Sequence, residues 1–388
     1  MTQALPASTS SPSNNKPAPA GLQGVVATSS EICMIEGQEG RLVYRGYEIG
    51  DLVENATFEE VAFLLWNNKL PTRTELTTLH HQVAAASVLP RHAVTILQSL
   101  PPSKQPMDAL RTVVSSLGAT DPDLTSNETD ANQRKAIRLT AQFPSIVTAF
   151  HRLRNGEQPV QPDPSLSIAG NFLYMLTGKR PHDTLVRVMD AALVLHAEHG
   201  MNASTFAARV IAATLADMHA AVTGAIAALK GPLHGGANQD VMELLLEAGS
   251  PDALETKIRG MLANKQKVPG FGHRVYRAFD PRATFLRKMS KQLGEAAGNT
   301  QWYEMSERLI PLMKAEKNLN PNVDFFSASA YYTMGIPLDL FTPIFAIARV
   351  AGWTAHVMEQ HTNNRIIRPT DDYTGPLGLK VTPVDQRG

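Results

Sequence analysis

Residues 185–196 read LVRVMDAALVLH, with apolar side chains at 185, 188, 189, 192 and 193 on one face of a helix. This spacing of three to four residues is typical of an amphipathic helix packed on a core. The same spacing recurs through most of the chain, for example over 58–66, and prolines stand at or near the starts of these segments, where proline is tolerated. Only near the N-terminus does it break, where two apolar runs around the turn 36–40 predict a β-hairpin over 31–46. We therefore expect an all-α fold of about fifteen or more helices with one short N-terminal β-hairpin.

The composition limits the class of protein. The chain has 388 residues, with 36 Lys and Arg against 36 Asp and Glu, so it carries no formal net charge. That balance disfavours binding to nucleic acid or to a membrane surface. Hydrophobic residues make up 43% of the chain, enough for a buried core, and the length favours about two domains. Cys33 is the only cysteine, which excludes an internal disulfide and suits a reducing, cytoplasmic location.

No uncharged run reaches the roughly 18 apolar residues that a membrane-spanning helix needs. Residues 1–20 are rich in Pro, Ser and Ala, lack the apolar core of a signal peptide and contain no arginine. We therefore expect a protein without a membrane span, and a disordered tail over 1–20.

Three turns in the C-terminal half, rich in glycine or proline, each carry one side chain suited to acid–base chemistry. They are GPLHGGAN at 231–238 with His234, VPGFGH at 268–273 with His273, and NPNVD at 320–324 with Asp324. Each turn runs into a helical pattern. Turns of this kind bring backbone close to a ligand while a rigid element holds the side chain.

His234 stands before a helix that we expect to begin near Gly236. Positive charge is unfavourable at a helix N-terminus, so a histidine there tends to stay neutral and can donate a hydrogen bond to a developing oxyanion. The simpler alternative is a histidine that merely caps the loop.

His273 is followed by three arginines, at 274, 277 and 282. Their charges would lower the basicity of the imidazole and attract an anion; the simpler alternative is an exposed basic loop. The string 270–275 imitates a dinucleotide-binding motif, but it lacks the third glycine and a preceding strand, so we reject that interpretation.

Asp324 directly precedes Phe325 and Phe326. A carboxylate beside apolar rings loses solvation, gains basicity and can take a proton from carbon. The simpler alternative is a helix N-cap, a frequent role for aspartate. The sequence does not separate the two.

His196 and His199 lie three residues apart and share a helix face, which suggests a metal site. The His-Glu-x-x-His pattern is absent and no full ligand set can be assembled from local spacing, so we expect no metal. A packing role suits His196, and His199 resembles the edge of a site.

Three arginines complete the set of residues suited to substrate binding. Arg349 lies inside an apolar helix, where a buried guanidinium needs an anionic partner, and carboxylate or phosphate is its natural ligand. Arg365 and Arg368 could likewise bind an anionic substrate; the simpler alternative is that both lie on the solvated surface. No Walker loop, serine-nucleophile elbow or kinase motif is present.

Together these motifs resemble, in order and spacing, those of the citrate synthase family. The similarity extends from about Gly21 to the C-terminus. Beyond the three turns it covers GLQGV at 21–25, YRGY at 44–47, HAEHGMNAST at 196–205 and NRIIRP at 364–369.

The resemblance implies a catalytic role for each of the three turns. Asp324 would be the base that takes a methyl proton from acetyl-CoA, and His234 would donate a hydrogen bond to the thioester oxygen. His273 would polarise and protonate the ketone of oxaloacetate.

The resemblance also implies two sets of binding residues. The oxaloacetate carboxylates would be held by His199, Arg282, Arg349 and Arg368, the last from the other subunit of a homodimer. Coenzyme A would be contacted by Val268, Gly270, Gly272 and Arg277. Acetyl-CoA is a substrate, and no further cofactor is implied.

The family fold implies two helical domains. The large domain would comprise 21–235 and 338–388, and the small domain, 236–337, would close over the substrates and exclude water. The short polar segment before the hairpin resembles the short dimeric forms of the family rather than the longer hexamers that NADH inhibits. Assembly beyond a dimer stays open.

Two alternative functions stay open. A 2-methylcitrate synthase would use propionyl-CoA through the same residues, because one methylene is worth only about 1 to 3 kcal/mol in an apolar pocket. A helical ligand- or metal-binding protein without catalysis would require the three turns to be unrelated in space.

Overall fold

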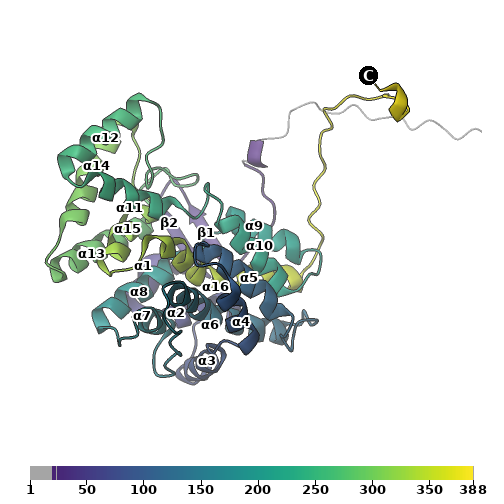
Figure 1. Ribbon diagram of the computed structural model, residues 1–388, viewed down its shortest axis with the longest axis horizontal. Helices are drawn as coiled ribbons and strands as arrows, with labels where there is room; N and C mark the ends of the chain where they lie inside the picture. The colour runs from purple at the N-terminus through teal and green to yellow at the C-terminus, as the bar shows by residue number, and fades with distance from the viewer. Residues whose placement is uncertain (1–19, 23, 388) are drawn as a thin grey trace, which may run out of the picture. The chain divides into compact units, whose positions relative to one another are not determined.

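The helices follow the periodicity of the sequence. The computed structural model describes residues 20–22 and 24–387, so the tail predicted over 1–20 lies almost wholly outside the described residues. The described part contains sixteen α-helices and three short strands (Figure 1). The helices are α1 Ile49–Asn55, α2 Phe58–Asn67, α3 Arg73–Ala86, α4 Arg91–Ser99, α5 Pro106–Gly118, α6 Thr129–Arg154, α7 Ile168–Thr177, α8 Asp183–His196, α9 Ala203–Ala212, α10 Met218–Leu229, α11 Ala237–Ala248, α12 Pro251–Ala263, α13 Pro281–Ala296, α14 Gln301–Lys317, α15 Val323–Thr333 and α16 Phe341–Thr362. The mainly helical prediction is confirmed.

The chain divides into two units. One comprises residues 30–366 and holds all of these helices and strands. The other joins residues 1–29 to 367–388, and its described part contains the 3₁₀ turns Ala20–Leu22 and Val384–Gln386. Residues 368–387 are exposed.

The predicted hairpin is present and carries a short third strand. β1 (Cys33–Glu36) pairs antiparallel with β2 (Arg41–Tyr44), and β2 pairs with the two-residue β3 (Tyr47–Glu48). Arg45 and Gly46, which join β2 to β3, have φ of +47° and +89°. Two successive left-handed residues form the tight turn that suits the twist of paired strands. The strand that follows this turn was not predicted.

Helix starts agree with the sequence signals. Thr57 and Glu60 form a reciprocal capping box at α2, as Thr72 and Glu75 do at α3. Proline occupies the first turn of α5, α12 and α13, where its missing N–H costs nothing. Pro144 is an exception because it lies inside α6.

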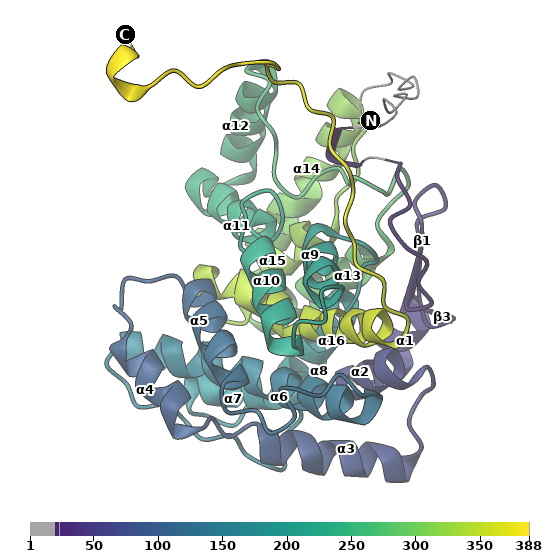
Figure 2. The same cartoon turned by 90° about the vertical axis from the view of Figure 1, so that its right-hand side faces the viewer.

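Helix α16 is the central element of the 30–366 unit. It packs against α2, α6, α8, α9 and α10, and Figure 2 shows it among them. Among the described residues it is the one helix long and apolar enough to cross a membrane, but its apolar stretch is entirely buried within the protein. A helix that is apolar all round is expected in the core of a large domain.

Helices α11 to α15 pack on one another and occupy the segment predicted as the small domain. They are joined to the remaining helices through contacts of α11 with α16 and of α13 with α1 and α8. The domain boundaries, and closure of this segment over a substrate, stay predictions.

Candidate active site

Two of the predicted loops are hydrogen-bonded side by side. Gly270 has a φ of +77°, and a Cβ there would lie 2.7 Å from the side chains of Phe325 and Val241, so glycine is required. This antiparallel pairing leaves His273 just beyond one end of the paired segments and Asp324 just beyond the other. The contacts are a β-bridge between Phe271 and Pro321 and hydrogen bonds from Asn322 N to Gly270 O (2.9 Å), from Gly272 N to Asn320 O (2.9 Å) and from Asn322 Nδ2 to Gly272 O (3.0 Å).

His273 is held as a neutral imidazole with its proton on one nitrogen. Its Nδ1 accepts hydrogen bonds from the backbone N–H groups of Val275 (3.0 Å) and Tyr276 (3.1 Å). Both partners can only donate, so the ring proton lies on Nε2. Burial, reinforced by the charge of Arg282, lowers the pKa of His273 to about 4. Burial is therefore the main cause, and Arg282 is the one of the three predicted arginines that contributes.

His199 lies against His273. Their ring centroids are 5.1 Å apart, and the ring of Tyr276 packs on both. His199 Nε2 shares a hydrogen bond with the Tyr276 hydroxyl at 3.2 Å. Burial, followed by the charge of Arg282, lowers the pKa of His199 well below its usual value. His199 therefore offers a neutral hydrogen-bonding group rather than a positive charge.

His234 is also held neutral. Its Nε2 lies 2.8 Å from Ser204 Oγ and 3.3 Å from Ser204 N, and the Ser204 hydroxyl and N–H also donate to Asn202 Oδ1 at 2.7 and 3.1 Å. Trp353 fixes the serine by donating from Nε1 to Oγ at 3.1 Å. Burial and then the charge of Arg349 lower the pKa of His234 to about 4. Gly236 is the N-cap of α11, as expected.

Asp324 is the second residue of α15 and not its N-cap. The N-cap is Asn322, whose side-chain oxygen accepts from the Asp324 N–H at 3.0 Å, so the capping alternative is wrong. The Asp324 side chain is half-buried. Its loss of solvation raises the pKa to about 6, against the opposing charge of Arg282. The carboxylate is therefore ionised at neutral pH and more basic than an ordinary aspartate.

Arg282 is paired with Asp280. Its Nε donates to Oδ1 at 3.0 Å and its Nη2 to Oδ2 at 2.8 Å, and both side chains are almost fully buried. Although burial opposes it, the Asp280 carboxylate raises the pKa of Arg282. Asp280 also caps α13 and accepts from the Val323 N–H at 3.2 Å. The pair therefore ties the start of α13 to the start of α15, beside Asp324.

Arg349 is buried in α16 with part of its guanidinium unsatisfied. Nε donates to the backbone oxygen of His196 at 2.7 Å and Cζ lies 4.7 Å from the centroid of the Phe345 ring, which also contacts His196 and His234. Nη2 is buried without a hydrogen-bond partner. Burial lowers the pKa of Arg349, and the charge of Glu198 opposes that shift. A buried donor without an acceptor is what an anionic ligand would complete.

His196 packs in the core, with Nδ1 at 2.8 Å from the oxygen of Ala192. Within 20–22 and 24–387, no three His, Cys, Asp or Glu side chains come together as metal ligands.

The remaining predicted residues belong to the loop that ends at His273 or to the chain beyond α16. Val268 is buried, Gly272 has a φ of +79°, and Arg277 is exposed. Arg365 is exposed after α16, and Arg368 belongs to the other unit, where it is exposed. The assignments of these residues to coenzyme A and oxaloacetate stay predictions.

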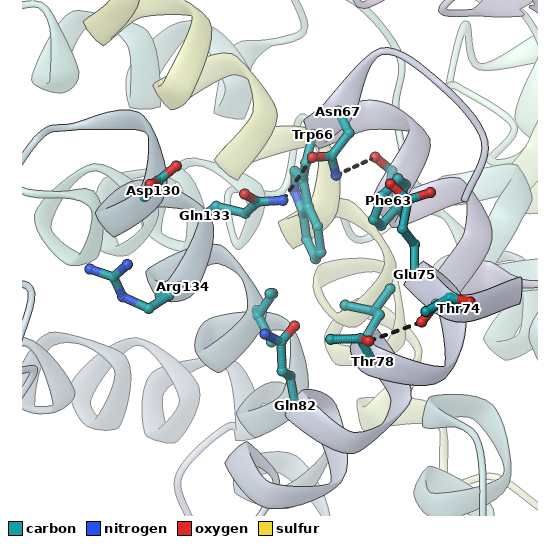
Figure 3. Close-up of a pocket in the computed structure, with 12 residues that line it drawn as sticks. Phe63, Trp66, Asn67, Thr74, Glu75, Thr78, Gln82, Asp130, Gln133 and Arg134 are labelled. Carbon is teal, nitrogen blue, oxygen red and sulfur yellow. Dashed lines mark hydrogen bonds between the residues drawn. The ribbon is translucent and has the colours of Figure 1, made fainter. Parts of the chain in front are cut away.

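The cavity in Figure 3 is not this site. It has a volume of about 440 Å³ and lies between α2, α3 and α6. Among its polar side chains, Gln133 donates to Asn67 Oδ1 at 2.8 Å, and none of the predicted residues lines the cavity. We therefore do not assign the chemistry to this cavity.

Sequence reasoning missed Ser204, Tyr276 and Asp280, the partners of the predicted residues. One signal was available: an aspartate directly before Pro281 is a typical helix start, which places Asp280 two residues before Arg282. The contacts of Ser204 and Tyr276 cross between distant segments, and no local pattern announces them.

The chain is similar to known proteins over most of its length. Residues 21–370 match the family model described as "Citrate synthase, C-terminal domain". Citrate synthase 2 of Bacillus subtilis is 50% identical over 368 residues, 95% of this chain and 98% of that protein. The citrate/2-methylcitrate synthase of the same organism is 43% identical and covers 92% and 96% of the two chains. The citrate synthase of Thermoplasma acidophilum, solved as a ternary complex with carboxymethyl coenzyme A and oxaloacetate, matches with a TM-score of 0.89 at 31% identity, over 95% and 98% of the chains.

Proposed function

This chain belongs to the citrate synthase family, and on that premise we propose how its residues act in the reaction. It is an acyltransferase that condenses acetyl-CoA with oxaloacetate and hydrolyses citryl-CoA to citrate and CoA. The non-catalytic alternative is thereby set aside. The role of each side chain in the reaction follows from its contacts in the structure.

Asp324 takes the proton from the acetyl methyl group. The proton is weakly acidic, so its removal needs a basic group and simultaneous stabilisation of the enolate oxygen. Partial burial, which raises the pKa of Asp324 to about 6, supplies the first. We assign the second to the Nδ1–H of His234, because its Nε2 already lies beside Ser204.

His273 activates the ketone of oxaloacetate. The two backbone donors on Nδ1 leave the Nε2–H as its proton, which is donated to the ketone oxygen as the carbon–carbon bond forms. Burial, which lowers the pKa of His273 to about 4, keeps the ring neutral at physiological pH. The ring therefore acts as a neutral acid and regains its proton after the step.

The carboxylates of oxaloacetate are met by His199 and two arginines. The unpartnered Nη2 of Arg349 offers a charge-assisted donor. The Nε and Nη2 atoms of Arg282 are already bonded to Asp280, so a substrate carboxylate would meet its Nη1 edge. Coenzyme A would lie along Val268, Gly270 and Gly272, with Arg277 toward a phosphate.

The observation that carries these roles is the proton position on His273, which two backbone N–H groups set because they can only donate. The test is a thiol-release assay with oxaloacetate and acetyl-CoA. We expect turnover in the wild type and a loss of at least about a hundredfold in His273→Gln. Normal turnover in that variant would overturn the role of His273.

The choice of acyl group is tested in the same assay. One relative is a citrate/2-methylcitrate synthase, so propionyl-CoA is the second candidate substrate. We propose acetyl-CoA, because citrate synthase 2 of Bacillus subtilis is 50% identical over 368 residues. A higher kcat/KM for propionyl-CoA would reverse the assignment.

A homodimer in the cytoplasm completes the proposal. The segment after residue 366 is exposed and carries apolar side chains, among them Leu377, Leu379 and Val381, each at least 79% exposed. Apolar side chains displayed in this way are suited to covering by a second copy of the chain. Arg368, in the same segment, would then reach the substrate of the partner subunit. The single cysteine of the sequence suits the reducing cytoplasm.

Mixing subunits tests the dimer. Asp324→Asn and Arg368→Ala should each be nearly inactive as homodimers. Co-assembled, they should recover turnover, because one site in each mixed dimer then carries both intact residues. Verified exchange of subunits without recovery would mean that Arg368 serves its own chain or no site.

A further inference from the structure

One face of α16 lies along the segment 196–209, which holds His199 and the serine that contacts His234. Successive turns of the helix meet this segment, and Figure 2 shows α16 next to α9. The contacts are Arg349 Nε to His196 O (2.7 Å), Gly352 against Glu198, Trp353 Nε1 to Ser204 Oγ (3.1 Å), His356 Nε2 to Glu198 Oε1 (3.1 Å) and Gln360 Oε1 to Arg209 Nε (3.1 Å).

A series of charged side chains and one histidine, linked by hydrogen bonds, runs along this face. His356 lies between Glu198 and Arg209, with Nδ1 at 3.0 Å from Arg209 Nη1. Arg209 is paired in turn with Glu359 at 2.5 Å, and Glu359 accepts from the backbone N–H of Glu31 at 3.0 Å. Glu198, His356 and Arg209 are each at most 3% exposed.

Arg209 decides where the proton of His356 lies. A guanidinium has only donors, so the His356 Nδ1 that faces it must accept. The ring is therefore neutral, and its single proton is on Nε2, which donates to Glu198 Oε1. The two hydrogen bonds therefore run in one direction: Arg209 donates to His356, and His356 donates to the carboxylate of Glu198.

Glu198 connects this series of hydrogen-bonded side chains to the candidate site in two ways. It directly precedes His199, and its charge is the one that most opposes the fall in the pKa of Arg349. Its Oε2 is buried against α16, where a Cβ on Gly352 would overlap it. The carboxylate is therefore held in one position by the donor of His356 and by close packing.

We propose that His356 is a positioning residue for oxaloacetate: by holding Glu198, it fixes the segment 196–199, which carries His199 and the backbone oxygen that bonds to Arg349, without touching the substrate. This inference rests on the proposed function, since it takes oxaloacetate as the ligand. A hydrogen bond to a charged group is among the stronger ones in a protein, so without it Glu198 would no longer keep one position, and we expect oxaloacetate binding to weaken about tenfold or more.

The test measures the dissociation constant of oxaloacetate by calorimetry, in the absence of acyl-CoA, for variants at residue 356. His356→Leu should weaken oxaloacetate about tenfold or more while the KM for acetyl-CoA changes less than about threefold. His356→Gln keeps an amide donor within reach of Glu198 and should bind within about threefold of the wild type. His356→Asn is too short to reach Glu198 and should resemble the leucine variant.

His219→Leu is the matched control. His219 is equally buried and faces a carboxylate, Asp121, at 3.5 Å, but its charged neighbours are Asp121, Asp217, Lys135 and Arg138. The variant should lose thermal stability and keep its oxaloacetate affinity.

Equal oxaloacetate affinity in the leucine, asparagine and wild-type proteins overturns the proposal. If the leucine variant does not fold, the glutamine and asparagine variants decide, and equal binding by those two also overturns it. If the wild-type protein binds no oxaloacetate, the proposed function itself is wrong. This result differs from equal binding by the variants, so the two failures can be told apart.

Discussion

Arg138 and Arg349 show two different uses of an arginine shielded from solvent. Arg138, on α6, donates from Nε and Nη2 to Asp121 at 2.9 and 2.7 Å and from Nη2 to Asp123 at 2.7 Å. Arg349, on α16, donates to one backbone oxygen and leaves Nη2 without a partner, although it is more deeply buried. One guanidinium is satisfied by the fold, and the other is not.

The difference separates structure from function. Leaving a buried donor unpaired costs about 1 to 3 kcal/mol, more for a charged group. An anionic ligand could recover that cost at Arg349, whereas the network of Arg138 has no open donor to offer one. The unpartnered Nη2 of Arg349 therefore marks the candidate site, which the cavity between α2, α3 and α6 does not.

The sharpest test of this contrast uses two aspartates. Asp324→Asn should reduce condensation by about a thousandfold or more, because an amide cannot accept the methyl proton, while oxaloacetate binding and thermal stability stay near normal. Asp121→Asn should do the reverse, lowering stability by about 1 to 3 kcal/mol with turnover unchanged. Turnover by thiol release and unfolding by calorimetry check both. Near-normal turnover in Asp324→Asn would show that this residue is not the base.

The two arginines give the next largest effect. Arg349→Gln should raise the KM for oxaloacetate about 10- to 100-fold, because a substrate carboxylate loses a charge-assisted donor. Its stability should fall less than that of Arg138→Gln, since Arg349 makes one hydrogen bond within the fold, to the backbone oxygen of His196, and Arg138 makes three. Arg138→Gln should lower the melting temperature and leave the KM unchanged. If the two variants behave alike in both assays, the contrast between them fails.

The pH dependence of the reaction sharpens the role of Asp324. Since partial burial raises the pKa of Asp324 to about 6, kcat/KM should fall about tenfold per pH unit as the pH drops below 6 and the base is protonated. Burial lowers the pKa of both His234 and His273 to about 4, so these two stay neutral over that range. Circular dichroism at each pH controls for unfolding. A flat profile down to a pH of about 5 would contradict the assignment.

The smallest expected effect concerns Asp190, a carboxyl group outside the candidate site whose pKa is raised. Burial, followed by the charge of Glu59, raises the pKa of Asp190 to about 8. Asp190 therefore binds its proton more tightly in the folded chain, which loses stability as the pH rises from about 4 to about 8, by up to about 1.4 kcal/mol per unit.

Asp190→Asn should flatten that slope and stabilise the protein at a pH of about 8, with turnover unchanged. Its amide oxygen can still accept the Phe58 N–H that bonds to Asp190 at 3.2 Å. Urea unfolding at pH values of about 6 and about 8 checks the expectation. An unchanged slope would mean that Asp190 titrates in its ordinary range.

The sequence predicted the elements of this fold better than the contacts of its site. Periodicity, proline positions and capping boxes are local, so the helices and the first hairpin were accessible. The third strand was not predicted, because its two residues, Tyr47 and Glu48, are too few to show an alternating pattern.

The site divides in the same way. The residues at its turns were found because glycine and proline mark such turns. The roles of Ser204, Tyr276 and Arg209 depend on contacts between distant segments. The main cause of the lowered pKa of His273 is burial, which adjacent residues do not reveal. For Asp324, a local rule suggested an N-cap, and the chain uses Asn322 instead.

The central place of α16 has a consequence for how the chain is made. The helix begins at Phe341, so at about 5 to 20 residues per second a ribosome works for roughly 20 to 70 seconds before its first turn is synthesised. Until then, α2, α6, α8, α9 and α10 lack the partner that covers their apolar faces. During most of its synthesis the nascent chain therefore exposes apolar helix faces and is prone to aggregate. A stop codon before residue 341 should yield an aggregating fragment rather than a smaller enzyme.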